Sequence, residues 1–402
     1  MPTPDYPFPG GYEHCPGLDL PPEYLDLQRR CPVAPVTTVE GEDVILVTRM
    51  ADVRRVLAQA DTFSRQACTV KDDLREQAYL PDIDGPRHRA QRNMVRSSFT
   101  QQSAEQLRPR AIQITSDLLT AMERHTPPAD LIQHLALPLP VTIISELLGI
   151  AAQDRSQFGD WATAFLGLRP GASDAELASA SLAQRELYAY MEAQLAQRRR
   201  SPGTDLLSVL ATADSPDPSI DVTEHERILL AIAVLVAGFE TTTAMLANMT
   251  YLLLYRHPDW WKRLCSNPSQ VPAAVEEMLR ITPIDARDGM ARAVTRDVDL
   301  AGVTIPAGST VLVSKAAANR DPAAFTDPDR FNPDRPAAPG NITFGHGPHL
   351  CLGAHLARME LQVALSGLIR RFPALQAVTP EHEIAWKRST MRGPEQLLVR
   401  WS

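Results

Sequence analysis

One long apolar segment limits the folds open to this chain more than any other feature. The pattern is helical from about residue 223 to 255, and it is apolar on every side from Ile228 to Phe239. A helix without a polar face is buried in a protein core or in a membrane. Because a dozen apolar residues are too few to cross a bilayer, the segment predicts a central buried helix of a soluble protein.

The rest of the chain predicts more helices and a smaller share of strands. Helical periodicity runs from about residue 88 to 196, with breaks expected at Pro109, 127–128, 138–140 and 169–173. Residues 44–47 predict a strand, 51–58 a helix capped near Thr48, and 62–86 a long loop. Residues 294–314 alternate with turn glycines and predict β-hairpins. No repeat or linker divides the chain, so we predict one domain over 1–402, mainly α with small β-sheets.

Composition excludes several classes of protein. The 40 Lys and Arg against 48 Asp and Glu give a net charge of −8 without a basic run, which argues against a nucleic-acid partner. The five cysteines are scattered and odd in number, unlike a disulfide framework. The proline-rich start contains no readable signal peptide. We therefore expect a cytoplasmic monomer that binds neither nucleic acid nor membrane.

The segment from Phe344 to Gly353, FGHGPHLCLG, precedes an amphipathic helix that extends to about Arg371. Glycines let a backbone approach a flat ligand closely. A cysteine at a helix N-terminus is stabilised as the thiolate by N–H groups and the helix dipole, and a thiolate can ligate haem iron. From the residues alone, Cys351 could also be a core cysteine. It could instead share a zinc ion with nearby histidines, although no CxxC partner is present. Those histidines are His346, His349 and His355.

This segment resembles the haem-binding signature of soluble bacterial, actinobacterial-type cytochromes P450. The match covers every defining position: Phe344, Gly345, Gly347, His349, Cys351 and Gly353. The resemblance extends over about residues 32–401. It implies the P450 fold, a triangular-prism helical domain with a β-rich subregion. It also implies haem b (iron protoporphyrin IX), with Cys351 as the iron ligand.

Two more motifs occur in the order expected for this family. Glu277 and Arg280 lie on one helix face, where an exposed pair would contribute little; the resemblance implies a buried pair joined by Arg335. In the long apolar helix, Gly238, Glu240 and Thr241 are costly in a buried position. A glycine kink with threonines bonded to i−4 carbonyls would explain them. The resemblance instead implies an oxygen-binding groove beside Ala237, with Thr241 hydrogen-bonding dioxygen and Glu240 relaying protons.

Haem carries two propionates, which need cations or hydrogen-bond donors in a buried site. The resemblance assigns this role to His88, Arg92, Arg292 and His349, although each alone is also typical of a solvated surface. Phe344 and Gly345 would complete the cofactor site. By position, the substrate pocket would include the 65–83 loop and the following residues: Ala233, Val236, Ile284, Asp288 and Met391. Asp285, near the same wall, could meet a polar group of the substrate or point to solvent.

The implied activity is that of a monooxygenase that activates O2 to hydroxylate or epoxidise a small organic substrate, as a tailoring step on a specialised metabolite. Oxidative coupling, desaturation or rearrangement is an alternative, and a haem ligand sensor is a non-enzymatic one. Since no flavin or nicotinamide motif is present, we expect electrons from a ferredoxin and a ferredoxin reductase. Four arginines predict a positive docking patch: Arg87, Arg89, Arg92 and Arg96.

Overall fold

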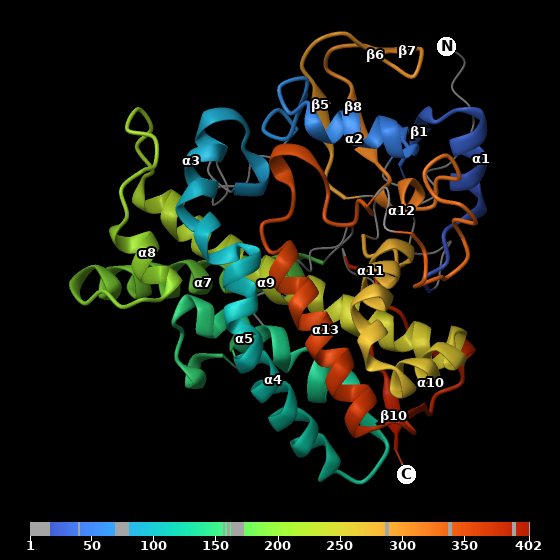
Figure 1. Ribbon diagram of the computed structural model, residues 1–402. Helices are drawn as coiled ribbons and strands as arrows, with labels where there is room; N and C mark the ends of the chain where they lie inside the picture. Colours follow the sequence, from blue (N-terminus) through green and yellow to red (C-terminus); the bar gives the residue numbers. More distant parts are fainter. Residues whose placement is uncertain are drawn as a thin grey trace.

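The long apolar segment forms helix α9 (Glu224–Tyr251), which crosses the middle of the helical part of the molecule (Figure 1). Thr223 and Glu226 close its N-terminus by a reciprocal capping box. The apolar helix that continues to Arg256 is long enough to cross a membrane, but 78% of its most apolar window is buried inside the protein. Within the described chain, this helix is therefore a core element, as predicted.

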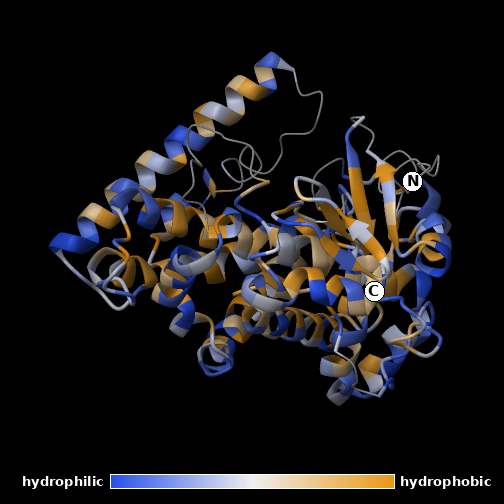
Figure 2. Cartoon of the chain, turned by 90° about the horizontal axis from the view of Figure 1, so that it is seen from above, coloured by the Kyte–Doolittle hydropathy of each residue, from blue (hydrophilic) through white to orange (hydrophobic). Residues whose placement is uncertain are grey.

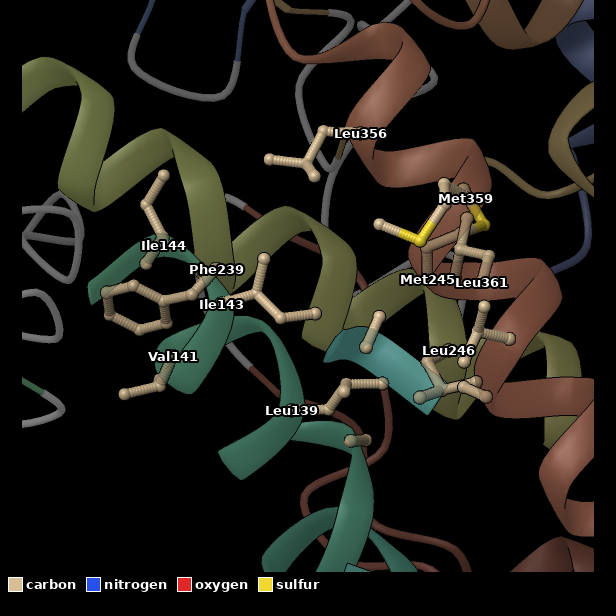
Figure 3. Packing of buried hydrophobic residues seen from close by; sticks show 14 of the residues in the cluster. Leu139, Val141, Ile143, Ile144, Phe239, Met245, Leu246, Leu356, Met359 and Leu361 are labelled. Atoms are coloured by element: carbon tan, nitrogen blue, oxygen red, sulfur yellow. The ribbon is translucent and has the colours of Figure 1, made fainter. Parts of the chain in front are cut away.

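Helices α5 (Pro138–Leu148) and α13 (Ala354–Arg371) pack against α9. Figure 3 shows Ile143 and Ile144 of α5 beside Phe239 of α9, and Met359 of α13 close to Met245 of α9. A Cβ atom on Gly238 would lie 2.7 Å from Ile144 Cγ1. Gly238 therefore permits close packing of α5 on α9, and the α-helix continues through it.

The computed structural model describes residues 17–38, 41–68, 80–155, 157–158, 161, 173–285, 289–336, 340–387 and 391–401. The other α-helices described are α1 Pro22–Arg30, α2 Met50–Ala58, α3 Gly85–Val95, α4 Gln101–Glu123, α7 Asp174–Arg200, α8 Leu206–Thr212, α10 Pro258–Ser266, α11 Val271–Ile281 and α12 Lys315–Ala318. The strands described are β1 Val33–Thr37, β2 Asp43–Val47, β3 Phe63–Ser64, β4 Ala129–Asp130, β5 Arg292–Val294, β6 Val298–Leu300, β7 Val303–Ile305, β8 Thr310–Val313, β9 Gln376–Ala377 and β10 Leu398–Arg400.

The larger sheet has the strand order β1-β2-β8-β5-β3 and forms a β-rich corner beside the helices (Figure 1). Only β2 and β8 pair in parallel within it. Figure 2 shows that its strands are largely hydrophobic, whereas polar and apolar residues mix along the outer helices. The β6–β7 hairpin and the β5–β8 pair confirm the hairpins predicted for residues 294–314. The mainly α class with small sheets is confirmed as well.

Three local predictions were wrong. Pro109 lies inside α4 and does not end it, because packing of α4 against α13 outweighs the lost hydrogen bond. The residue before α2 is Arg49, and Thr48 makes no cap: its hydroxyl donates to the Pro32 carbonyl. Phe63 and Ser64, predicted to be loop, pair with β5 as an edge strand.

Candidate functional site

Cys351 lies in a tight turn between a 3₁₀ turn (Gly347–His349) and the start of α13. Its N–H donates to the Phe344 carbonyl at 2.8 Å, which closes the loop. Gly345 and Gly347 have φ angles of 79° and 72°. A Cβ atom on Gly347 would lie 2.5 Å from the Leu57 carbonyl oxygen, so only glycine fits there.

Burial and the groups around the Cys351 sulfur act on its pKa in opposite directions. Burial raises the pKa of the thiol. The Gly353 N–H and the charges of Lys315, Arg92 and Arg358 lower it, but they do not reverse the shift. A bound metal cation would favour the thiolate further. Cys351 as a whole residue is nevertheless exposed, so a ligand can approach the turn.

The two competing interpretations of Cys351 find no support. In the described part of the chain, no group of three histidine, cysteine or acidic side chains could hold a metal ion. His349 instead bonds to Asp84, and His346 and His355 are exposed. An exposed cysteine residue is also unlike a packed core cysteine.

The four predicted propionate partners come from three separate segments. His88 and Arg92 lie one turn apart on α3, Arg292 begins β5, and His349 ends the 3₁₀ turn. The imidazole rings of His88 and His349 lie with their centroids 4.3 Å apart. Arg92 donates to the Leu350 carbonyl at 2.6 Å, which joins α3 to the cysteine loop. The fold therefore brings His88, Arg92 and His349 together.

Arg292 shows that this region suits an anionic ligand. Its guanidinium is 3% exposed, and Nη1 donates to the Phe63 carbonyl while Nε has no partner among the described residues. Burial and the charge of Arg65 lower its pKa to about 10, although the charge of Asp84 opposes this shift. A buried guanidinium with an unpaired N–H donor favours the binding of an anion. A haem edge with two carboxylates fits this donor set.

Helix α9 presents the second part of the site. Ala233 and Val236 are buried, whereas Ala237 is exposed in the middle of this otherwise buried helix. Burial raises the pKa of Glu240, and the charge of Lys387 partly opposes the shift. Glu240 Oε2 is buried and has no partner among the described residues. Thr241 Oγ1 donates to the Ala237 carbonyl at 3.0 Å, which is the i−4 bond expected of a threonine inside a helix.

Glu277 and Arg280 form a buried, two-pronged ion pair, with both contacts at 2.8 Å. Arg335 Nε reaches the same carboxylate at 3.3 Å, and the Asn332 N–H donates to it at 2.9 Å. Arg280 Nη1 also donates to the carbonyls of Asn319 and Pro328, both at 2.7 Å. The pair therefore fixes α11 to the segment that leads to the cysteine loop.

The predicted substrate wall is only partly described. The Arg392 N–H donates to the Ile284 carbonyl at 2.8 Å, and Met391 forms a backbone bridge to Asp285. The Asp285 carboxylate does not point freely to solvent, because it pairs with Lys315 Nζ at 2.7 Å. Asp288 and residues 69–79 of the 65–83 loop lie outside the described residues.

The predicted arginine patch is smaller than the sequence indicated. Arg87 donates to the buried carboxylate of Glu226, and Arg92 is bonded to the cysteine loop. Of the four, Arg89 and Arg96 remain exposed and make no such bond to another segment within the described chain. Sequence reasoning missed the partner of Arg87, although the pattern Thr223-x-x-Glu226 is a recognisable capping box. No pattern in the sequence predicted that the charge of Lys387 acts on Glu240.

His88 gives a pH prediction for the haem-free chain. Burial and the charges of His349 and Arg92 lower its pKa to about 4, from 6.5 in the unfolded chain. The unfolded chain therefore binds more protons below pH 6.5, and stability is lost as the pH falls from about 6.5 to 4. We expect His88 to account for about 3 kcal/mol of that loss. Urea unfolding of wild type and His88→Gln at several pH values measures it, and parallel pH curves for the two would contradict it.

Comparison with known proteins gives matches along almost the whole chain. The family model described as Cytochrome P450 matches residues 141–399. The mycinamicin IV hydroxylase/epoxidase of Micromonospora griseorubida is 41% identical over 393 residues, covering 96% of both chains. Nocardicin C N-oxygenase of Nocardia uniformis subsp. tsuyamanensis is 39% identical over 392 residues, with the same coverage. The crystal structure of cytochrome P450mel 107F1, with biaryl coupling reactivity, gives a TM-score of 0.88 at 37% identity, covering 99% of this chain and 100% of that one.

Proposed function

The chain belongs to the cytochrome P450 family, and on that premise we propose that it inserts an oxygen atom into a specialised metabolite, with Cys351 as the ligand of its haem iron. The P450 fold, the haem b cofactor and the monooxygenase class predicted from the sequence are confirmed by the same relatives. The observation that carries the proposed site is the placement of Cys351, an exposed residue in a glycine-tight turn, beside a cluster of cationic donors.

In this proposal, several residues of the chain hold the cofactor. Cys351 would bind the iron, and Phe344, Gly345 and Ala237 would lie against the ring. The two carboxylates would pair with the cluster of His88, Arg92, Arg292 and His349. Bound haem with a thiolate ligand supplies the activation of dioxygen.

Glu240 and Thr241 are proposed to deliver protons. A buried carboxyl with a raised pKa keeps its proton to a higher pH than a solvated one, and it can release that proton to an acceptor on the inner side of α9. The Lys387 charge opposes that shift, which keeps the group able to ionise and be reprotonated. The Thr241 hydroxyl donates to the Ala237 carbonyl, and its oxygen can accept a hydrogen bond at the same time. It would orient the proton acceptor beside Ala237.

Glu240→Gln is expected to slow product formation about 10²-fold, because an amide cannot release a proton. Electron consumption should continue, with the electrons diverted to hydrogen peroxide. The measurement is product and peroxide formed per NADH consumed with a ferredoxin and its reductase. Thr243→Val is the matched control, because the Thr243 hydroxyl is buried without a partner among the described residues and its loss should leave that ratio unchanged. An unchanged product yield for Glu240→Gln would exclude the proposed relay.

The substrate is proposed to be a small metabolite that is hydroxylated or epoxidised between α9, Ile284 and Met391. The names of the relatives support oxygen insertion, since they include a hydroxylase/epoxidase and an N-oxygenase. Biaryl coupling by P450mel 107F1 keeps oxidative coupling as the second candidate. Product mass separates the two: insertion adds one oxygen atom, whereas coupling removes two hydrogens.

The partners are proposed to be a ferredoxin and its reductase, with Arg89 and Arg96 attracting an acidic ferredoxin to the α3 side. Turnover should then fall steeply with added salt.

We propose a cytoplasmic monomer with residues 1–402 in one domain, supported by a hydrophobic cluster that includes both Leu18 and Val399. A haem ligand sensor would need no sustained electron supply. The deciding experiment is a compound library tested for displacement of the iron-bound water, followed by turnover of each binder.

A further inference from the structure

We propose that Asp84 is a positioning residue that fixes the His349 ring, and through it the donor cluster for the haem carboxylates. This inference rests on the proposed function. Asp84 occupies the N-cap position of α3, where an aspartate usually accepts a hydrogen bond from the first turn of the helix. Its side chain makes no such bond to α3. The carboxylate is directed away from the helix and bonds to two other segments instead.

One oxygen of the carboxylate holds the segment that follows β3. Oδ2 accepts from the Ser64 hydroxyl at 2.8 Å, from the Arg65 N–H at 2.7 Å and from the Gln66 N–H at 3.1 Å. Arg65 is itself fixed by an ion pair with Asp82 at 2.6 Å, in which both side chains are almost fully buried. Asp84 is therefore held rigidly on this side, which is a requirement for orienting a further group.

The other oxygen of Asp84 contacts the cysteine loop. His349 Nε2 lies 2.8 Å from Oδ1, and both side chains are 12% exposed. Because an ionised carboxylate can only accept, Nε2 must carry a proton and donate it to Asp84. Burial alone would raise the pKa of Asp84, but hydrogen bonds from His349, Gln66 and Ser64 hold it at about 2. The contact thus fixes the ring orientation and reserves Nδ1 for another partner.

The position of this carboxylate links all the proposed haem-edge donors. The His88 ring contacts the His349 ring. The Asp84 charge raises the pKa of both His88 and Arg292, although burial lowers each pKa by more. Arg92 bonds to Leu350, next to His349 in the chain. A carboxylate at the junction of the β3 segment, α3 and the cysteine loop can therefore set the geometry of the whole cluster.

If Asp84 only stabilises the fold, its replacement should have no specific effect on the haem carboxylates. Experiments on the haem-loaded protein distinguish this role from the proposed positioning role. Asp84→Asn should speed haem transfer to apomyoglobin about 10-fold, the effect typical of losing a residue that orients a ligand. It should also shift the propionate bands in resonance Raman spectra while leaving the thiolate-dependent spectrum intact. Asp82→Asn is the matched control, since it loosens the same segment through Arg65 without touching His349.

A double variant tests whether Asp84 acts through His349. If it does, Asp84→Asn combined with His349→Gln should lose haem no faster than His349→Gln alone. The proposal is overturned if Asp84→Asn leaves transfer rate and propionate bands unchanged, if Asp82→Asn accelerates transfer equally, or if the two substitutions add. Failure of the proposed function looks different: the wild-type protein would then lack a thiolate-ligated haem before any variant is made.

Discussion

Cys351→Ser is expected to abolish substrate oxidation, with product below detection, while the protein still folds. A serine hydroxyl does not ionise near neutral pH, so the electron donation of a thiolate is lost. The donors around Arg292 and His349 do not depend on the sulfur, and haem should still bind, although more weakly. Product formation and the haem content of the purified variant measure the two effects.

Cys265→Ser is the control for that substitution. Cys265 is partly buried and lies on α10, with a long contact to the Pro373 carbonyl. Its replacement should leave oxidation and haem content near wild type. Oxidation that survives in Cys351→Ser would show that another residue binds the iron, and equal loss in both variants would indicate a general effect of removing cysteines.

Glu277→Gln is expected to lower the free energy of unfolding by about 3–5 kcal/mol, because it leaves the Arg280 charge buried without its partner. Glu277 and Arg280 are 5% and 3% exposed, and the carboxylate also accepts from Arg335 and the Asn332 N–H. A loss of this size is a large share of a domain's total stability. Urea unfolding, with the yield of haem-loaded protein as a second measurement, tests it.

An exposed ion pair provides the comparison. Arg263 pairs with Asp334 at 2.9 Å, but the side chains are 44% and 53% exposed. Arg263→Gln should therefore cost less than about 1 kcal/mol. If Glu277→Gln costs no more than Arg263→Gln, burial does not make the Glu277–Arg280 pair important, and its proposed role in fixing the cysteine loop fails.

The sequence predicted those parts of the fold that depend on local patterns. The apolar run from Ile228 to Phe239 predicted the buried α9, and the turn glycines after Arg280 predicted the hairpins. Pro109 was misjudged because tertiary packing on α13 outweighs a local propensity. The pairing of Phe63 with Val294 was missed since the two lie far apart in the chain and a two-residue strand has no periodicity.

The residue types of the candidate site were readable, but their environments were not. The motif around Cys351 predicted N–H groups that favour a thiolate, and the Gly353 N–H does lower the pKa of the thiol, but the burial that raises this pKa could not be predicted from the motif. Arg87 was grouped with surface arginines because its partner, Glu226, lies at the start of a distant helix. The bond between Asp84 and His349 could not be predicted, because it joins residues far apart in the chain. Desolvation and long-range contacts arise only when the chain folds, so the local sequence pattern does not predict them.

The central claim is that the sulfur of Cys351 binds the haem iron. The most direct measurement is the absorption spectrum of the reduced wild-type protein under carbon monoxide. The account predicts the strongly red-shifted Soret band that a thiolate opposite carbon monoxide produces. A band at the position given by histidine-ligated haem, or by haem without a protein ligand, in freshly purified and folded protein would contradict it.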